Sequence, residues 1–258
     1  MPLESLPALR YRSSHSVQPA VFHNVLYDTD YVSTDGGTIV LAWCQGQILG
    51  VTCRHVIKLR SPNDLLIHFD PGQMEAWKPH QSGYIQGIDD LAAESEVEDV
   101  LLLALDRSGA GGRTEAISIE LSVEPEVGDH LVVAGFPKAR MECAIPLGRA
   151  VCFETEIFDK GRTTDDPYLR CAGATFTDVE PEPAEGLSGS LVFNLTKQTP
   201  AGIVLRASKI QNDFCVHYIP FASILPVIQG FAARTRIRQV FEFNFHVGGP
   251  VKNNWITV

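Results

Sequence analysis

Hydrophobic residues fall in short runs along the first half of the chain, and these runs are rich in Val, Ile, Leu and aromatic side chains. Turn-forming sequences such as DGG, SPND and DPG separate the runs at regular spacing. Short apolar runs between such turns are typical of β-strands, and no long helical periodicity interrupts them. The predicted strands are residues 21–27, 38–44, 47–53, 65–69, 83–88, 99–105 and 117–121.

The same pattern restarts after a connector over residues 121–129, which predicts a second β-unit of similar size. Its predicted strands are residues 130–136, 143–158, 167–174, 190–195, 202–207 and 214–219. We therefore expect an N-terminal unit over residues 20–122, a C-terminal unit over residues 123–231 and an extension over residues 232–258.

The end of the chain carries two further patterns. Residues 221–229 (FASILPVIQ) fit a short helix, with Pro226 tolerated only near its start. Residues 240–246 (VFEFNFH) alternate Phe with polar side chains, and this alternation predicts a half-buried strand.

Composition narrows the class of protein. Of 258 residues, 45% are hydrophobic and 20% are charged, so a folded chain with a sizeable core is expected. The formal net charge of −10 argues against a nucleic-acid partner, because such a partner requires a basic surface. No apolar run reaches the roughly 20 residues that cross a membrane, so no membrane association is expected.

Cysteine usage adds an expectation about location. The six cysteines form no CxxC pair, so a zinc ribbon is not expected. Residues 1–16 contain no apolar segment of the kind found in a signal peptide. We therefore predict reduced, mostly buried thiols in a cytoplasmic protein.

The stretch with the clearest chemistry is residues 184–192 (AEGLSGSLV), where Ser188 lies between two glycines. A nucleophilic hydroxyl must project from the backbone next to N–H groups that can hold a developing oxyanion. A glycine two positions before the serine allows a tight bend that frees such N–H groups. On its own, this pattern fits a Gly/Ser turn between strands better than it fits a catalytic serine.

A serine nucleophile also needs a base, and the base needs a carboxylate that fixes its tautomer. His55 is the best candidate base, because an apolar strand ends directly before it and would hold it rigidly. Asp99 is the best candidate carboxylate, because it opens the otherwise apolar run 99–105, where a partly buried acid needs a partner.

The order His55, Asp99, Ser188 resembles that of the chymotrypsin-like serine proteases and differs from the order in subtilisins and α/β-hydrolases. Five local motifs carry the resemblance, which covers roughly residues 20–230. They are residues 52–56 (TCRHV), 99–103 (DVLLL), 135–137 (GFP), 186–191 (GLSGSL) and 202–204 (GIV).

The resemblance implies an all-β fold of two six-stranded antiparallel barrels with the active site in the cleft between them. It also implies a trypsin-like serine endopeptidase in which Ser188 attacks the peptide carbonyl, His55 takes its proton and Asp99 orients the imidazole. The N–H groups of Gly186 and Ser188 would form the oxyanion hole. No metal or cofactor is expected. The expected partner is a protein or peptide substrate, and activation by a regulatory protein is left open.

The chain departs from the family pattern beside the serine. Leu187 replaces the aspartate that receives the new N-terminus after zymogen cleavage in secreted digestive members, so that activation route is not expected. Ser190 and Leu191 replace the commoner Gly-Pro, which leaves both oxyanion-hole donors in place. The cysteines do not bracket His55 as the family's disulfide would, which favours an intracellular, bacterial-type branch of the family. Cys53 is expected to be a core residue and not a catalytic one, because the oxyanion glycines flank a serine.

The substrate pocket is expected to be walled by residues before Ser188 and by the strand that follows it, including Leu205. Glu182 lies where the resemblance to trypsin would place an acid that selects Arg or Lys, but an exposed acidic loop fits this stretch equally well. Arg206 could favour an acidic substrate side chain or pair with Glu182, and His217 could also favour an acidic one. A preference for a small or an apolar side chain stays open as well.

Two other classes of protein remain as alternatives. One is a catalytically silent protein of this fold used for binding, since fold alone does not determine function. The other is an α/β-hydrolase with the order Ser188, Asp213, His246, which is disfavoured because Ser190 stands where the nucleophile elbow has glycine.

Overall fold

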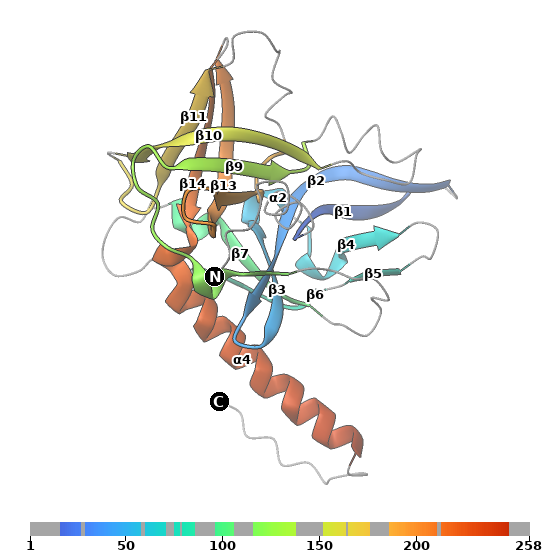
Figure 1. Ribbon diagram of the computed structural model, residues 1–258. Coiled ribbons are helices and arrows are strands. Elements are labelled where there is room, and N and C mark those ends of the chain that lie inside the picture. The colour runs from blue at the N-terminus through green and yellow to red at the C-terminus, as the bar shows by residue number, and fades with distance from the viewer. Residues whose placement is uncertain are drawn as a thin grey trace.

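The computed structural model describes most of the chain as strands, with one long helix near the C-terminus. The described residues are 16–26, 29–57, 60–70, 75–77, 79–85, 96–105, 116–137, 152–163, 165–175, 186–210 and 213–247. Among them, the helices lack the length of apolar sequence that crossing a membrane requires. Figure 1 shows a barrel over the start of the helix and a sheet beside it.

The N-terminal half forms a sheet of eight strands in the order β5-β4-β1-β2-β3-β7-β6, with β8 pairing parallel to β2. Its strands are β1 (Val17–Leu26), β2 (Thr29–Cys44), β3 (Gln47–Cys53), β4 (Leu65–Asp70), β5 (Glu75–Trp77), β6 (Pro79–Tyr84), β7 (Val100–Leu105) and β8 (Ile117–Ser118). The prediction of an all-β fold is confirmed. In this half, however, the described strands do not close into a six-stranded barrel.

The C-terminal half is a closed barrel in the order β10-β11-β14-β13-β12-β9, in which every neighbouring pair is antiparallel. Its strands are β9 (His130–Gly135), β10 (Phe153–Arg162), β11 (Arg170–Thr175), β12 (Leu191–Asn194), β13 (Thr199–Ile210) and β14 (Asp213–Pro220). Alternate residues of β10 are buried and exposed, because successive side chains of a strand point to opposite faces.

The described core has one cluster inside the barrel, a larger one between the barrel, the sheet and the helix, and a third on the other face of the N-terminal sheet. Val133, Val204 and Val216 belong to the first cluster, whereas Val132, Val51 and Ile219 belong to the second. Neighbouring residues such as Val132 and Val133 therefore serve different cores. This arrangement buries both faces of β9, which explains why its sequence is a continuous apolar run.

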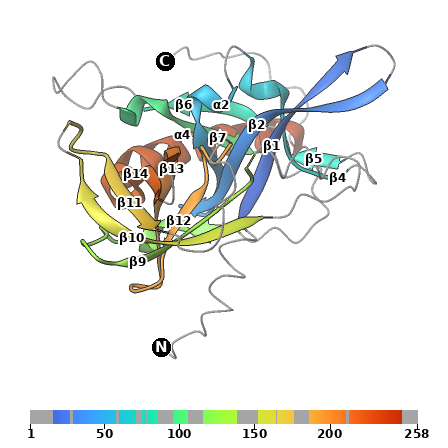
Figure 2. The ribbon, with the colours of Figure 1, turned by 90° about the horizontal axis from the view of Figure 1, so that it is seen from above.

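Helix α4 (Phe221–Val247) corrects the prediction of a strand over residues 240–246. The helix predicted over 221–229 is present, but it continues to Val247 without interruption. Its first turns bury Ile224, Ile228 and Phe231, which recur at helical spacing. Once those turns are formed, each added residue gains a hydrogen bond for one residue fixed, so the helix extends through the alternating segment. Figure 2 shows the helix from above.

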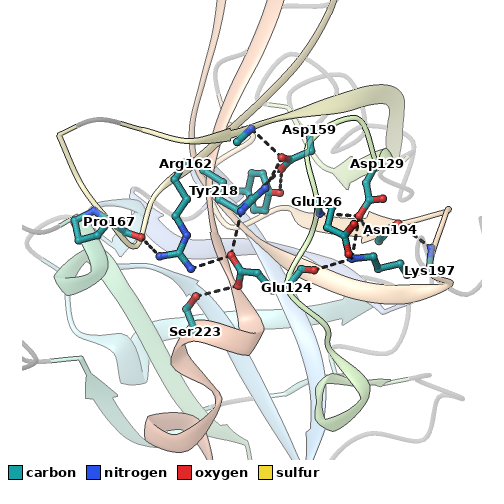
Figure 3. A network of polar contacts seen from close by, with 12 residues as sticks. Glu124, Glu126, Asp129, Asp159, Arg162, Pro167, Asn194, Lys197, Tyr218 and Ser223 are labelled. Atoms are coloured by element: carbon teal, nitrogen blue, oxygen red, sulfur yellow. Dashed lines mark hydrogen bonds and ion pairs between the residues drawn. The ribbon is translucent and has the colours of Figure 1, made fainter.

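A buried polar network fixes the connector between the two halves (Figure 3). The guanidinium of Arg170 donates from Nε to Asp159 at 3.0 Å and from Nη2 at 2.5 Å, and Tyr218 donates its hydroxyl to the same carboxylate. Arg170 also donates to Glu124 of the connector at 3.1 Å, and Ser223 of α4 donates to that carboxylate at 3.3 Å. The network therefore ties the barrel, the connector and the helix together.

Candidate active site

His55 and Asp99 are mounted on the same edge of the N-terminal sheet. The short helix α2 (Arg54–Ile57) begins directly after β3, and the 3₁₀ helix η2 (Glu96–Asp99) ends directly before β7. Strands β3 and β7 pair so that Cys53 lies opposite Val100. His55, two residues after Cys53, and Asp99, directly before Val100, are therefore brought close together.

The Asp99 carboxylate contacts His55 through both oxygens. Asp99 Oδ1 accepts the backbone N–H of His55 at 2.9 Å, and Oδ2 lies 2.5 Å from the imidazole Nδ1. This arrangement fixes the orientation of the ring, and it favours the tautomer that carries its proton on Nδ1. The side chain of His55 is 52% exposed, so Nε2 is left accessible from solvent as a proton acceptor.

The loop that carries Ser188 is shaped by two glycines with positive φ. Gly186 has a φ of 91° and Gly189 a φ of 85°, a backbone conformation that favours glycine. At Gly189 space is limiting as well, because a Cβ there would lie 1.9 Å from the carbonyl oxygen of Thr38. Between them, Leu187 is buried inside the barrel, and its carbonyl accepts the N–H of Ser190 at 3.0 Å.

The segment that carries His55 and the loop that carries Ser188 meet at Gly37 of β2. A Cβ at Gly37 would lie 2.8 Å from the side chain of Val56 and 3.0 Å from the carbonyl oxygen of Ser188. Val56 directly follows His55, so the histidine and the serine loop are neighbours. The Ser188 hydroxyl makes no hydrogen bond to any described residue, His55 included. Hydrogen bonds between a nucleophile and its base are often long before substrate binds.

Thr38 supports the Ser188 loop, a role that no local sequence pattern indicates. Its N–H donates to the Ser188 carbonyl at 3.1 Å, and its carbonyl accepts the Thr52 hydroxyl at 2.7 Å. Its own hydroxyl oxygen accepts the N–H of Phe136 at 2.8 Å and lies 3.3 Å from the hydroxyl of Ser190. Thr38 therefore joins the sheet to the barrel directly behind the serine.

Replacing Thr38 by valine is expected to lower the free energy of unfolding by about 1–3 kcal/mol, because the buried Phe136 N–H would lose its partner. A denaturant titration would measure the change. Thr155→Val is the matched control, since Thr155 is also a buried strand residue and its hydroxyl bonds to no described residue. Equal stability of the Thr38→Val and wild-type proteins would contradict the supporting role.

The residues predicted to line the pocket lie in different settings. Glu182 is outside the described residues. Leu205 is buried in the core between the two halves, and the largely exposed Arg206 pairs with Glu96 at 2.8 Å. His217 is half-buried and lies opposite Arg206 in the β13–β14 pair. Burial and the Arg206 guanidinium lower the pKa of His217, which keeps its imidazole neutral near pH 7.

The helix η2 is held from the barrel side as well. The N–H of Glu96 donates to the buried Asp166 at 2.9 Å, and the Glu96 carboxylate pairs with the Arg206 guanidinium at 2.8 Å. Burial raises the pKa of Glu96, and the carboxylates of Asp166 and Asp99 raise it further against the effect of Arg206. The barrel therefore helps to place the helix that ends in Asp99. The sequence did not reveal this support, because Glu96 and Asp166 lie in unremarkable acidic stretches.

Two groups of side chains have the geometry to hold a metal ion, among the residues that the structure describes. They are Cys53 with His55 and Asp99, and Cys171 with Cys215 and His217. Cys53 is fully buried and its thiol donates to the carbonyl of Val204 at 3.2 Å. Burial raises the pKa of this thiol, so it stays protonated and is a poor ligand. The position agrees with a core role for Cys53.

Comparisons with known proteins place the fold. No protein-family model and no curated protein matches the chain. Neuropsin, a serine protease of mouse brain, aligns with a TM-score of 0.58 and 12% identity over 86% of this chain and 96% of its own. A serine endoprotease from Yersinia pestis aligns with a TM-score of 0.54 and 16% identity, over 88% of this chain and 66% of its own.

A third solved structure, human heparin binding protein, aligns with a TM-score of 0.55 and 14% identity over 85% of this chain and 92% of its own. Identities this low establish the fold alone. The agreement covers both halves of the chain, including the closed six-stranded barrel. The chain therefore has the fold of the chymotrypsin-like serine proteases.

Proposed function

We propose that the protein is a serine endopeptidase with His55, Asp99 and Ser188 as its catalytic triad. The observation that carries the proposal is the double contact of the Asp99 carboxylate with His55, made next to the loop that presents Ser188. Such a contact aims a neutral imidazole and stabilises its protonated form during the reaction. The solved structures of this fold that are named as proteases support the same reaction class.

In the proposed mechanism, His55 Nε2 takes the proton of the Ser188 hydroxyl as its oxygen attacks a peptide carbonyl. The protonated His55 then gives that proton to the leaving amine, and an acyl group remains on Ser188. Water, deprotonated by His55, then attacks the acyl group. As the bond to Ser188 breaks, His55 returns the proton to the Ser188 oxygen, which releases the acid product and restores the enzyme. Asp99 stays ionised throughout and stabilises the imidazolium.

The oxyanion hole is proposed at the N–H groups of Gly186 and Ser188. Neither N–H donates to a described residue, so both are available for the oxygen of the tetrahedral intermediate. The positive φ of Gly186 supports this role, because it turns the peptide at the start of the loop. Donors fixed before reaction stabilise the developing charge without reorganising.

Control of the activity is proposed to differ from zymogen cleavage. Leu187 is 1% exposed inside the barrel, and an apolar side chain there cannot receive the ammonium of a new N-terminus. Activation by a partner protein would act on the same loop. The five described cysteines are free thiols, in keeping with the proposed cytoplasmic location.

The substrate side chain before the scissile bond is selected in one of two ways. A Glu182 that reaches the pocket would favour Arg or Lys, the trypsin-like preference. Arg206 would favour an acidic side chain, but its pairing with Glu96 already offsets its charge. We therefore propose the basic preference, and cleavage of a diverse peptide library would distinguish the two.

A silent binding protein is the second candidate, supported by the missing hydrogen bond between Ser188 and His55 and by a protein of this fold named for heparin binding. A polyanion such as heparin is a poor fit to this chain, whose net charge is −10. The proposed protease and the binding protein differ in whether Ser188 is reactive.

A fluorophosphonate probe tests that difference directly, because it labels only a serine activated by a working base and oxyanion hole. We expect stoichiometric labelling of the purified chain at Ser188, located by peptide mass mapping. Heat-denatured protein is the control and should remain unlabelled. Absence of labelling in the folded chain, or labelling at another residue, would end the assignment.

A further inference from the structure

Cys171, Cys215 and His217 form a cluster on the outer face of the barrel, which we call the thiol–imidazole cluster. All three residues are half-buried, and one ligand atom from each lies within 4.8 Å of the others. Their neighbours Ala172, Val216 and Tyr218 belong to the core inside the barrel. Because side chains alternate along a strand, the cluster must face outward. None of its atoms takes part in the proposed triad.

The pairing of β11 and β14 sets the geometry of the cluster. Cys171 lies directly opposite His217, while Cys215 lies opposite Gly173, so the two cysteines are diagonal neighbours. Diagonal neighbours in a sheet have Cα atoms about 7–8 Å apart and Cβ atoms only somewhat closer, whereas a disulfide needs Cβ atoms about 3.5–4.5 Å apart. The two sulfurs nevertheless lie 3.0 Å apart, beyond the about 2.05 Å of a disulfide bond, and both cysteines are thiols in this structure.

We propose that Cys171, Cys215 and His217 bind a thiophilic divalent metal ion of the zinc class, with an open fourth position filled by water. Two thiolates and one imidazole are a ligand set that zinc accepts in sites with one exchangeable position. A tetrahedral ion with Zn–S bonds of about 2.3 Å separates its sulfurs by ~3.8 Å. The sulfurs here are 3.0 Å apart, so small rotations of the two side chains would admit the ion.

The charges around the cluster suit thiolate ligands. Lys160 Nζ lies 3.1 Å from the point where a Cβ on Gly173 would stand, beside Cys215. Arg206 lies opposite His217 in the β13–β14 pair, so a second cationic side chain lies beside the cluster. An imidazole such as that of His217 binds a metal through a ring nitrogen lone pair. Two bound thiolates would also cancel the charge of a divalent ion.

The thiol–imidazole cluster is connected to the proposed active site through one residue. Arg206 faces His217 across the β13–β14 pair and holds Glu96 of the helix that ends in Asp99. A bound ion would therefore add positive charge beside Arg206, which pairs with Glu96 of the helix that ends in Asp99. The binding claim itself does not depend on peptidase activity.

The test uses the full chain, reduced with a phosphine, stripped with a chelator and titrated with Zn²⁺ in competition with a chromophoric chelator. We expect binding of one ion, and replacement by Co²⁺ should give a thiolate-to-cobalt charge-transfer band and strong tetrahedral visible bands. Cys215→Ser and His217→Gln should each weaken binding by at least about 100-fold, because loss of an outer-sphere partner alone costs about 10–100-fold.

Two matched controls separate this site from other sulfur and nitrogen ligands. Cys152→Ser removes a half-buried thiol outside the cluster, and His130→Gln removes an imidazole that pairs with Glu156 at 2.8 Å. Both variants should bind zinc as the wild type does. His55→Gln should also retain zinc, which excludes the group formed by Cys53, His55 and Asp99.

Three results would overturn the proposal. One is zinc affinity that is unchanged in Cys215→Ser, and another is a Co²⁺ spectrum without thiolate bands. The third is a Cys171–Cys215 disulfide that is still present after treatment with the phosphine, as shown by thiol counting and mass. A loss of fluorophosphonate labelling with zinc binding intact would refute the protease but leave the metal site standing.

Discussion

Substitution of Ser188 by alanine is expected to lower kcat for peptide hydrolysis by roughly 10⁴- to 10⁶-fold, because it removes the hydroxyl on which the acyl intermediate forms. The fold should be unaffected. The Ser188 hydroxyl bonds to no described residue, and the contact of the Ser188 carbonyl with Thr38 uses the backbone alone. The measurement is kcat on the best substrate of a peptide library, with circular dichroism and thermal unfolding as checks of structure.

Ser82→Ala is the matched control for that experiment. Ser82 is an exposed serine on β6, in the same half as His55 and Asp99, and its replacement should leave kcat unchanged. Peptidase activity that survives in Ser188→Ala, in protein free of a contaminating protease, would show that another residue is the nucleophile. Labelling of Ser188 by the probe without any peptide turnover would instead indicate a reactive serine that lacks a suitable substrate.

Substitution of Asp99 by asparagine is the second large effect, expected at about 10⁴-fold in kcat. The carboxylate presents one oxygen to the His55 N–H and the other to Nδ1. An amide has a single oxygen, and if that oxygen keeps the backbone contact, its NH₂ group faces Nδ1. The ring must then carry its proton on Nε2, where it cannot accept a proton from Ser188.

Asp64→Asn is a suitable control, because Asp64 is an exposed acid in η1 (Pro62–Asp64) of the same half. Its replacement should change kcat by less than about 2-fold, as for most surface substitutions. The wild-type rate should also fall as the solution is acidified, since a protonated imidazole cannot act as a base. An Asp99→Asn enzyme with the wild-type rate would show that Asp99 is not the orienting group.

Local sequence signals predicted many of the strands well. The strand over residues 47–53 was predicted with the limits that β3 has, because a two-residue turn precedes it. Gln45 and Gly46 in that turn both have positive φ, as hairpin turns of this length require. The pattern over 240–246 misled for the converse reason. The alternation of Phe with polar residues matches the two faces of a strand, but it does not reveal that the helix begun at Phe221 continues through this segment.

In the candidate site, the three proposed catalytic residues could be predicted from the sequence, but the residues that support them could not. His55, Asp99 and Ser188 could be chosen from the sequence, because each stands at a strand end or between glycines in a recognisable order. The supports could not be chosen, since Thr38 and Asp166 carry no local signal and act through partners far along the chain. The side chain of Glu182 lies outside the described residues, so its place in the pocket stays a prediction.

The sequence by itself therefore determined the all-β class, the order of the three candidate catalytic residues and the absence of an aspartate at Leu187. Each of these properties can be recognised from a short stretch of sequence around the residue concerned. Only the tertiary structure decided that Asp99 meets His55 through both oxygens and that Cys171, Cys215 and His217 share one outer face. Such contacts depend on the register of strands separated by more than forty residues, and a shift of one residue would turn every side chain to the other face.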